Sequence, residues 1–329
     1  MPKLSPLLSV ALLSLNLTSA AQTPKTTVSQ SQRADTAAFT PWLFAGFKGN
    51  SEDGVYYALS PDGYHWTLAN SGKPVVHQTE PGELMRDPFL QRGPDGTFHL
   101  VWTWGWRTPT VIGHSTSTDL VHWTRHEPLP VMANEPKALN AWAPALYYEP
   151  DQKRWIIFWS STIPGRFPGD DSGDGGLNHR IWSTATPDFT TFTAARVFFD
   201  PGYSVIDATL IQPRTTSDYV LIFKDERKTP LEKHLLTAEG PTLEGPWTHI
   251  SPPISETWSE GAAIIPVHGG FLAYYDHYQK PQHYGAIFSS DLNLPWTDAT
   301  SQITFPAGMR HGSFLRITDA EFDRIAALK

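Results

Sequence analysis

The chain has 329 residues, of which 33 are acidic and 25 basic, for a formal charge of −8. This balance, without a basic cluster, argues against a nucleic-acid partner, because the phosphates of nucleic acids require a positive surface. The chain contains no cysteine, so its stability must come from its core rather than from disulfides.

The first residues predict a targeting signal rather than a part of the fold. Lys3 supplies a positive charge, residues 4–17 form a short apolar run, and residues 18–21 offer a small-residue cleavage site. We therefore expect a signal peptide over residues 1–21 and a secreted or periplasmic protein; a disordered N-terminus is the alternative. The apolar run is too short to span a bilayer. Residues 22–38, rich in Thr, Ser and Gln, are expected to form a flexible leader.

One turn pattern returns five times along the rest of the chain. In each copy a strand-like run ends in a short turn, and an aromatic residue follows a few positions later. The copies occupy residues 60–66, 117–123, 186–192, 241–247 and 290–296. They close on Trp66, Trp123, Phe192, Trp247 and Trp296, and we expect the four tryptophans to fill the cores of repeated units. A strand-rich repeat of roughly 50 to 60 residues is typical of a β-propeller with one blade per repeat.

Further strands complete the predicted blades. Apolar hairpins lie at residues 88–102, 145–159, 209–223 and 263–275, and a later strand with the one after each turn pattern gives four strands per blade. The fifth blade is split, because residues 42–47 and 55–59 lack an opening strand and residues 313–317 lack partners. Pairing these segments would close the ring and remove an exposed edge. The sequence thus predicts an all-β, five-bladed propeller over residues 39–318, followed by a C-terminal tail, residues 319–329, that forms a short amphipathic helix.

The openings of the five inner strands carry the candidate chemistry. They read Arg86-Asp87-Pro88, Trp142-Ala143-Pro144, Ile206-Asp207-Ala208, Ser259-Glu260-Gly261 and Arg310-His311-Gly312. A single carboxylate at a strand start is most simply a cap for loop amides. Three carboxylates in equivalent positions of different blades, which converge on the propeller axis, predict a functional site instead. Such a group suits glycosidic cleavage, which needs a protonated acid and a base or nucleophile.

In order and spacing, these segments resemble the signature of glycoside hydrolase family 43, a group of five-bladed propellers acting on arabinose, xylose or galactose linkages. The resemblance covers residues 39 to 317. It implies that Asp87 is the general base that activates water, Asp207 the aspartate that tunes the pKa of the acid, and Glu260 the general acid. Because the family inverts configuration, Asp87 and Glu260 are expected to stand roughly 6.5 to 9.5 Å apart. The charges of the two aspartates are expected to raise the pKa of Glu260.

The same resemblance bears on metal binding and on sugar preference. His311 matches an axial histidine that, in many members, lies near a hydrated ion, often calcium. No cofactor is required, and an axial calcium ion would be held mainly through water, because calcium prefers oxygen ligands. The family usually carries an acidic residue after Trp142-Ala143-Pro144, where this chain has Ala145. This difference leaves the sugar preference open.

Around the three carboxylates, five further side chains are expected to shape the sugar pocket: Arg86, Trp104, Trp142, Arg227 and His277. Arg227 ends a charged cluster that a solvated hairpin would also explain.

The leading hypothesis is an exported glycosidase whose partner is a carbohydrate. A non-catalytic, lectin-like propeller is the first alternative, although it has no need for both an acid and a base. Fructoside cleavage or transglycosylation is the second, but the Asn-Asp-Pro segment that carries its nucleophile is not found in this sequence. A scaffold for protein partners is the weakest hypothesis. The sugar, the anomer, exo or endo action and the oligomeric state stay open.

Overall fold

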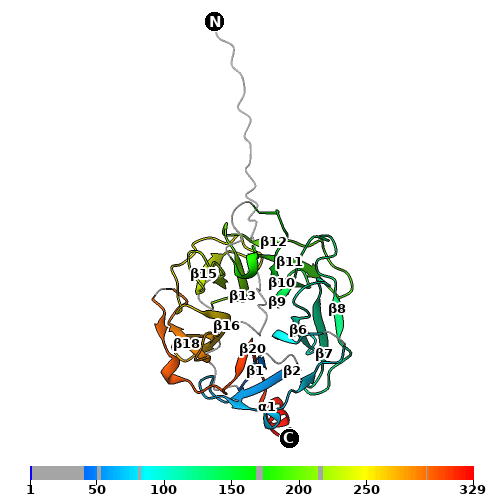
Figure 1. Ribbon diagram of the computed structural model, residues 1–329, viewed down its shortest axis with the longest axis vertical. Coiled ribbons are helices and arrows are strands. Elements are labelled where there is room, and N and C mark those ends of the chain that lie inside the picture. Colours follow the sequence, from blue (N-terminus) through cyan, green and yellow to red (C-terminus); the bar gives the residue numbers. More distant parts are fainter. Residues whose placement is uncertain (2–40, 50–52, 81–82, 168–172, 214–217, 294) are drawn as a thin grey trace.

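Five antiparallel sheets surround a central axis in the computed structural model (Figure 1). It describes residues 1, 41–49, 53–80, 83–167, 173–213, 218–293 and 295–329. The predicted five-bladed β-propeller is confirmed. The expected signal peptide and leader lie, apart from Met1, outside the described residues. Within the described part of the chain, no helix has the length and apolar character needed to cross a membrane.

We number the blades by the order of their inner strands along the chain. Blade 1 contains β5 (Arg86–Arg92), β6 (Phe98–Thr103), β7 (Ile112–Ser117) and β8 (Glu127–Leu129). Blade 2 contains β9 (Trp142–Glu149), β10 (Arg154–Ser161), β11 (Arg180–Thr186) and β12 (Arg196–Phe199). Blade 3 contains β13 (Val205–Ile211), β14 (Tyr219–Asp225) and β15 (Leu235–Gly240). Blade 4 contains β16 (Ser259–Val267), β17 (Gly270–His277), β18 (His283–Ser289) and β19 (Thr297–Asp298). Blade 5 contains β20 (Met309–Arg316), β1 (Trp42–Lys48), β2 (Gly54–Ser60), β3 (Thr67–Leu68) and β4 (Val76–His77).

The repeated turn pattern has one physical cause in blades 5, 1 and 2. An aspartate in each turn accepts two backbone N–H groups just after it, which makes a compact Asx turn. The three aspartates are Asp62, Asp119 and Asp188, with N–H···O distances of 2.8 to 2.9 Å. The turn places the closing aromatic residue against an apolar cluster between blades.

Five apolar clusters fill the five interfaces between neighbouring blades. One residue pair from each interface illustrates them: Leu43 with Leu90, Val101 with Ile157, Phe158 with Phe223, Ile222 with Ala273, and Tyr274 with Phe44. Each cluster receives one closing aromatic residue, namely Trp123, Phe192, Trp247, Trp296 and Trp66 in the same order. Trp66 is therefore a core residue, as expected, and the other four are partly buried against the edges of their clusters.

Blade 3 differs from the predicted four strands, because it has three. An isolated bridge between Glu239 and Thr248 takes the place of the fourth strand. The segment after β15 contains four prolines, at positions 241, 246, 252 and 253. Proline has no N–H to donate to a ladder, so this segment cannot pair as a regular strand.

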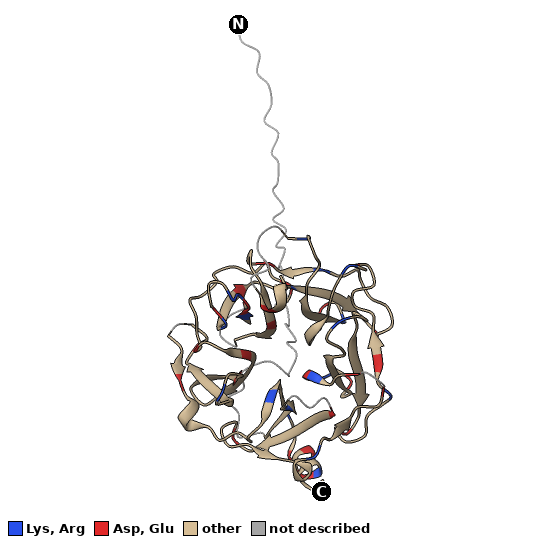
Figure 2. Ribbon diagram, in the orientation of Figure 1, with Lys and Arg blue, Asp and Glu red and all other residues tan. Residues whose placement is uncertain are grey.

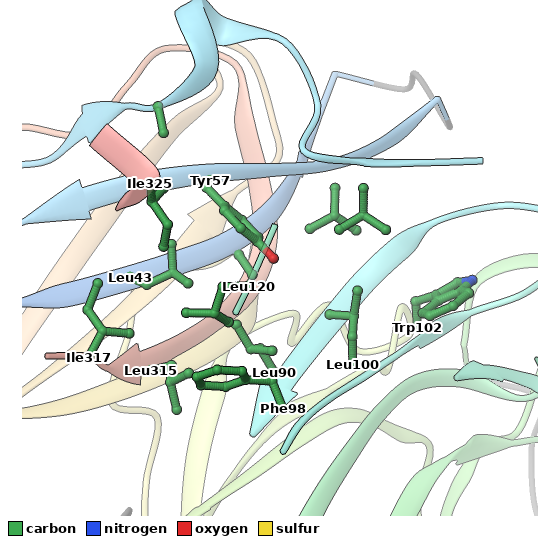
Figure 3. Packing of buried hydrophobic residues seen from close by; sticks show 14 of the residues in the cluster. Leu43, Tyr57, Leu90, Phe98, Leu100, Trp102, Leu120, Leu315, Ile317 and Ile325 are labelled. Atoms are coloured by element: carbon green, nitrogen blue, oxygen red, sulfur yellow. The ribbon is translucent and has the colours of Figure 1, made fainter. Parts of the chain in front are cut away.

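The first and last strands of the propeller, β1 and β20, close blade 5. β20 pairs with β1, and Leu315 lies opposite Leu43. Leu315 also packs with Leu43 of its own blade and with Leu90 of blade 1 in one buried cluster (Figure 3). The predicted closure of the ring is confirmed.

The chain ends in α1 (Asp319–Ala326), the short helix expected from the sequence, which is fixed against blade 1. Thr318 and Glu321 form a capping box at its start. Glu321 also accepts two hydrogen bonds from the Arg92 guanidinium, at 2.8 and 2.7 Å. Ile325 is fully buried in the cluster that contains Leu315 (Figure 3).

Replacing Leu315 with alanine tests the closure. Leu315 is 3% exposed, so Leu315→Ala is expected to lower the free energy of unfolding by about 2 to 5 kcal/mol through the cavity it leaves. Urea denaturation measures the change. Leu231→Ala, at a side chain that is 48% exposed, is the control and should stay within about 0.5 kcal/mol. Equal effects of the two variants would show that closure adds no stability.

Candidate active site

The inner strands open with β-bulges that aim side chains at the axis. In β5, β9, β13 and β16 the register with the next strand shifts near the first residues. One residue in each bulge has a left-handed backbone: Asp87 (φ 51°), Ala143 (φ 48°), Asp207 (φ 56°) and Gly261 (φ 61°). This conformation is uncommon for residues other than glycine and is often found at functional sites. A bulge also redirects the side chain it carries, which accounts for the convergence of the strand openings.

Glu260 does not occupy the position equivalent to Asp87 and Asp207, so the predicted register is wrong for this residue. The left-handed position of blade 4 is Gly261, and Glu260 stands one residue earlier. The close packing of His311 explains the glycine, because a Cβ at Gly261 would lie 2.3 Å from the imidazole ring.

The structure nevertheless brings Asp87, Asp207 and His311 together. His311 Nδ1 lies 3.3 Å from Asp87 Oδ1 and 3.8 Å from Asp207 Oδ2. The Gly261 N–H donates to Asp207 Oδ2 at 3.2 Å, which places Asp207 next to the start of blade 4. One histidine thus bridges carboxylates that are 120 positions apart in the sequence.

Asp87 is held by partners that favour its charged form. Thr103 Oγ1 donates to Asp87 Oδ2 at 2.8 Å and accepts the Ala143 N–H at 2.8 Å. Burial alone would raise the pKa of Asp87, but the hydrogen bond and charge of His311, with the charge of Arg86, lower this pKa to about 2. Asp87 is therefore ionised at neutral pH, as a general base must be.

Glu260 lies between two cations. Lys224 Nζ is 3.0 Å from Glu260 Oε2, and Arg310 Nη2 is 3.0 Å from Glu260 Oε1. Lys224 also pairs with Glu226 at 2.9 Å, and Arg310 with Asp276. The site therefore contains a buried cation, Lys224, and a partly buried one, Arg310, neither of which was given a role from the sequence.

These cations reverse the expected tuning of the acid. Burial would raise the pKa of Glu260, but the charges of Lys224 and Arg310 outweigh it, and the pKa lies below its ordinary value. Burial raises the pKa of Asp207 to about 7; the charges of Glu260 and Asp87 add to this rise and those of His311 and Lys224 oppose it. Among the three candidate carboxyls, Asp207 is thus the one that holds a proton near neutral pH.

Both basic and acidic positions lie on the inner part of the ring, near the propeller axis (Figure 2). His311 adds a positive charge to this group. Burial would lower its pKa, but the charges of Asp207 and Asp87 raise it to about 9. The imidazole is therefore protonated at neutral pH and lies as a cation between the two aspartates.

The residues around His311 do not fit a directly bound calcium ion. A protonated imidazole has no lone pair for a metal, and calcium takes six to eight oxygen ligands. Asp87 and Asp207 are the carboxylates near His311 Nδ1, and both already pair with the imidazolium. An axial ion held through water stays a prediction.

The five expected sugar-binding residues occupy different environments. Trp104, 9% exposed, belongs to the apolar cluster with Leu43 and stacks near Trp102, so the structure places it in the core. Arg227 pairs with Asp225 at 2.5 Å, at the end of β14. His277 lies 3.2 Å from Glu256, at the end of β17.

Arg86 and Trp142 meet at an aromatic residue that was not assigned to the pocket. The Arg86 guanidinium lies 4.6 Å from the ring centroid of Trp106, and the Trp106 and Trp142 rings pack edge to face at 5.8 Å. Trp106 is 47% exposed, so it offers a flat apolar face on which a sugar ring can stack. The exposure of Trp106 marks it as a candidate sugar-binding residue. Exposure cannot be read from the sequence, so the sequence alone did not assign Trp106 to the pocket.

Beyond the strand openings, the inner strands contribute to an apolar cluster and to a cavity, both separate from the candidate catalytic residues. Ala145, where the family usually has an acidic residue, is buried in the cluster between blades 2 and 3. Farther along the axis, a separate cavity is lined by residues such as Gln91, Tyr147, Thr209 and Ser313. The catalytic candidates do not line it.

Sequence comparison places the whole propeller in one family of domains. A family model described as "Probable glycosyl hydrolase domain" matches residues 37–323. An α-L-arabinofuranosidase from Bifidobacterium longum subsp. longum is 27% identical over 221 residues, covering 58% of this chain and 20% of that protein. A fructan 6-exohydrolase from Beta vulgaris is 34% identical over 90 residues, covering 26% of this chain and 15% of that protein. The chain therefore spans a fifth or less of the curated relatives it matches.

Comparison with solved structures supports the fold. An exo-β-1,3-galactanase from Clostridium thermocellum superimposes with a TM-score of 0.58 at 12% identity, over 81% of this chain and 60% of that chain. At this identity the match concerns the propeller architecture alone.

Proposed function

The chain belongs to the glycosyl hydrolase family related to family 43, and from this membership we propose an exported, inverting glycosidase. Its substrates would be arabinofuranosyl, xylosyl or galactosyl linkages in fragments of polysaccharides. The observation that carries the proposal is the cluster formed by Asp87, Asp207 and Glu260 with His311, Lys224 and Arg310. The N-terminal pattern of residues 1–21 motivates export.

In the proposed reaction, Asp87 accepts a proton from water while the water oxygen attacks the anomeric carbon. The glycosidic bond breaks at the same time, and the leaving oxygen takes a proton from Glu260. Asp207 binds the N–H of Gly261, the residue after Glu260, and the charge of Glu260 contributes to the raised pKa of Asp207, so in this proposal the two carboxyls together carry the proton that the leaving group needs. A sugar that displaces water from Glu260 would favour its protonated form.

Arg86, Trp106 and Trp142 would form one wall of the sugar site. The exposed face of Trp106 provides apolar stacking, and the neighbouring guanidinium provides hydrogen-bond donors for sugar hydroxyl groups. Tryptophan is well suited to this task because it combines a large flat ring with one polar N–H.

A substrate panel tests the proposal. Purified protein is assayed with 4-nitrophenyl α-L-arabinofuranoside, β-D-xyloside and β-D-galactoside, with arabinan, xylan and galactan oligosaccharides, and with a fructan. The fructan is included because of the similarity to a fructan exohydrolase. Release of pentose or galactose by wild type but not by Asp87→Asn is expected. Saturable binding of these oligosaccharides without release would favour the lectin-like alternative.

A further inference from the structure

A second cluster of possible metal ligands lies in blade 4, outside the carboxylate site. Glu256 precedes β16, His277 ends β17 and His283 begins β18. One ligand atom from each of these residues lies within 4.8 Å of the others. From this cluster we propose a binding site for a divalent transition metal, with zinc as the best-suited ion.

Two distances within the cluster match the spacing of ligand atoms around a tetrahedral ion. His277 Nδ1 is 3.2 Å from Glu256 Oε1, and His283 Nε2 is 3.4 Å from the same oxygen. Ligand atoms about 2.0 to 2.1 Å from a tetrahedral zinc ion stand about 3.4 Å apart. Two imidazoles and one carboxylate would then leave a fourth position for water. Nitrogen ligands favour zinc and related ions over calcium or magnesium.

The hydrogen bonds around the cluster leave two of its nitrogen atoms, His277 Nδ1 and His283 Nε2, without a well-matched partner. His283 Nδ1 lies 3.0 Å from the carbonyl oxygen of Pro281, so this nitrogen carries the proton. In the neutral ring, Nε2 then directs a lone pair at the Glu256 carboxylate, which also offers lone pairs. His277 Nδ1 is buried and has no hydrogen-bond partner within the described residues. The two rings are stacked with centroids 4.6 Å apart, so a turn of one ring would let both nitrogens and the carboxylate bind one cation.

A supporting contact around Glu256 also suits metal binding. Tyr275 Oη donates to Glu256 Oε1 at 3.1 Å, which orients the carboxylate. Hydrogen bonds such as those of Pro281 and Tyr275 are typical outer contacts of metal ligands, where they fix the tautomer of a histidine and the rotation of a carboxylate.

The site would tie the β17–β18 loop to the catalytic end of blade 4. The residue after His277 is Tyr278, whose ring lies 4.4 Å from Lys224 Nζ. Lys224 in turn binds Glu260. A metal on His277 would therefore restrain Tyr278, whose ring contacts Lys224, and Lys224 in turn contacts the proposed acid, Glu260. Metal binding itself does not depend on the proposed glycosidase activity.

Cobalt substitution tests the site directly. Metal-free full-length protein is titrated with Co²⁺, and metal content and visible absorption are measured after desalting. We expect one Co²⁺ per chain, with the visible bands of a low-symmetry site with nitrogen ligands, and displacement of the bands by Zn²⁺. No retained cobalt in wild type would overturn the proposal.

Matched variants locate the ion. His277→Ala, His283→Ala and Glu256→Gln should each weaken Zn²⁺ binding by more than the about 10- to 100-fold that loss of an outer contact costs. His249→Ala removes an exposed histidine that also pairs with a glutamate, Glu239 at 3.4 Å, and should bind Zn²⁺ as wild type does. Zn²⁺ should also raise the Tm of wild type and of His249→Ala, but not of His283→Ala. Equal binding by all four variants would place the metal elsewhere and contradict the proposal.

Discussion

Replacing Asp87 with asparagine is expected to lower kcat by about 10²- to 10⁴-fold while the propeller stays folded. The partners of Asp87 hold its pKa at about 2, so it is ionised and can accept a proton from water. Asparagine keeps the shape and can still accept the hydrogen bond from Thr103, but its amide is not a base. Steady-state hydrolysis of the best substrate measures the loss, and circular dichroism checks the fold.

Glu260→Gln is the companion variant, because it removes the proposed proton donor. Its loss of kcat should be of the same order on a natural oligosaccharide, and smaller on a nitrophenyl glycoside, whose leaving group needs little protonation. Asp151→Asn, at an exposed turn between β9 and β10, is the control and should keep wild-type turnover. If Asp87→Asn or Glu260→Gln turns over normally on the natural substrate, the role assigned to that residue is wrong.

The second large effect concerns pH and Asp207. In wild type Asp207 loses its proton as the pH rises through about 7. If this proton serves the leaving group, as proposed, the basic limb of kcat/KM should lie there. Asp207→Asn removes this carboxyl. Glu260 then stays beside Lys224 and Arg310, which lower its pKa below the ordinary value. The basic limb should therefore move to lower pH, with a loss at pH 7 of about 10²-fold or more.

Profiles of kcat/KM against pH for wild type and Asp207→Asn measure this shift. The substrate must be one whose single-turnover and steady-state rates agree, so that chemistry limits both enzymes. A basic limb that does not move would mean that Asp207 does not tune the acid. Asp207 would then be a sugar-binding or structural carboxylate.

The sequence predicted the ring because its signals are local. Closing aromatic residues recur with each blade and Asx turns with three of them, and the unpartnered strand at residues 313–317 indicated closure with the N-terminal blade. The four prolines after β15 also indicate that blade 3 lacks a regular fourth strand. The prediction followed the repeat pattern instead and assigned four strands to this blade.

The electrostatics of the site were not predictable in the same way. Lys224 lies in the middle strand of blade 3 and Arg310 in blade 5, yet both reach Glu260. Their contacts depend on which blades are neighbours and on the bulge at each strand opening, and neither is encoded by local spacing. The one-residue offset of Glu260 has the same origin, because it follows from the packing of His311 against Gly261.

The anomer released first by the enzyme tests the central claim most directly. Proton NMR follows hydrolysis of the best substrate from the first minutes, before mutarotation mixes the products. If Asp87 activates water on the face opposite the leaving group, the sugar appears with inverted configuration. A product with retained configuration would mean that a carboxylate attacks the sugar as a nucleophile, as in the fructoside alternative, and would contradict the account given for Asp87.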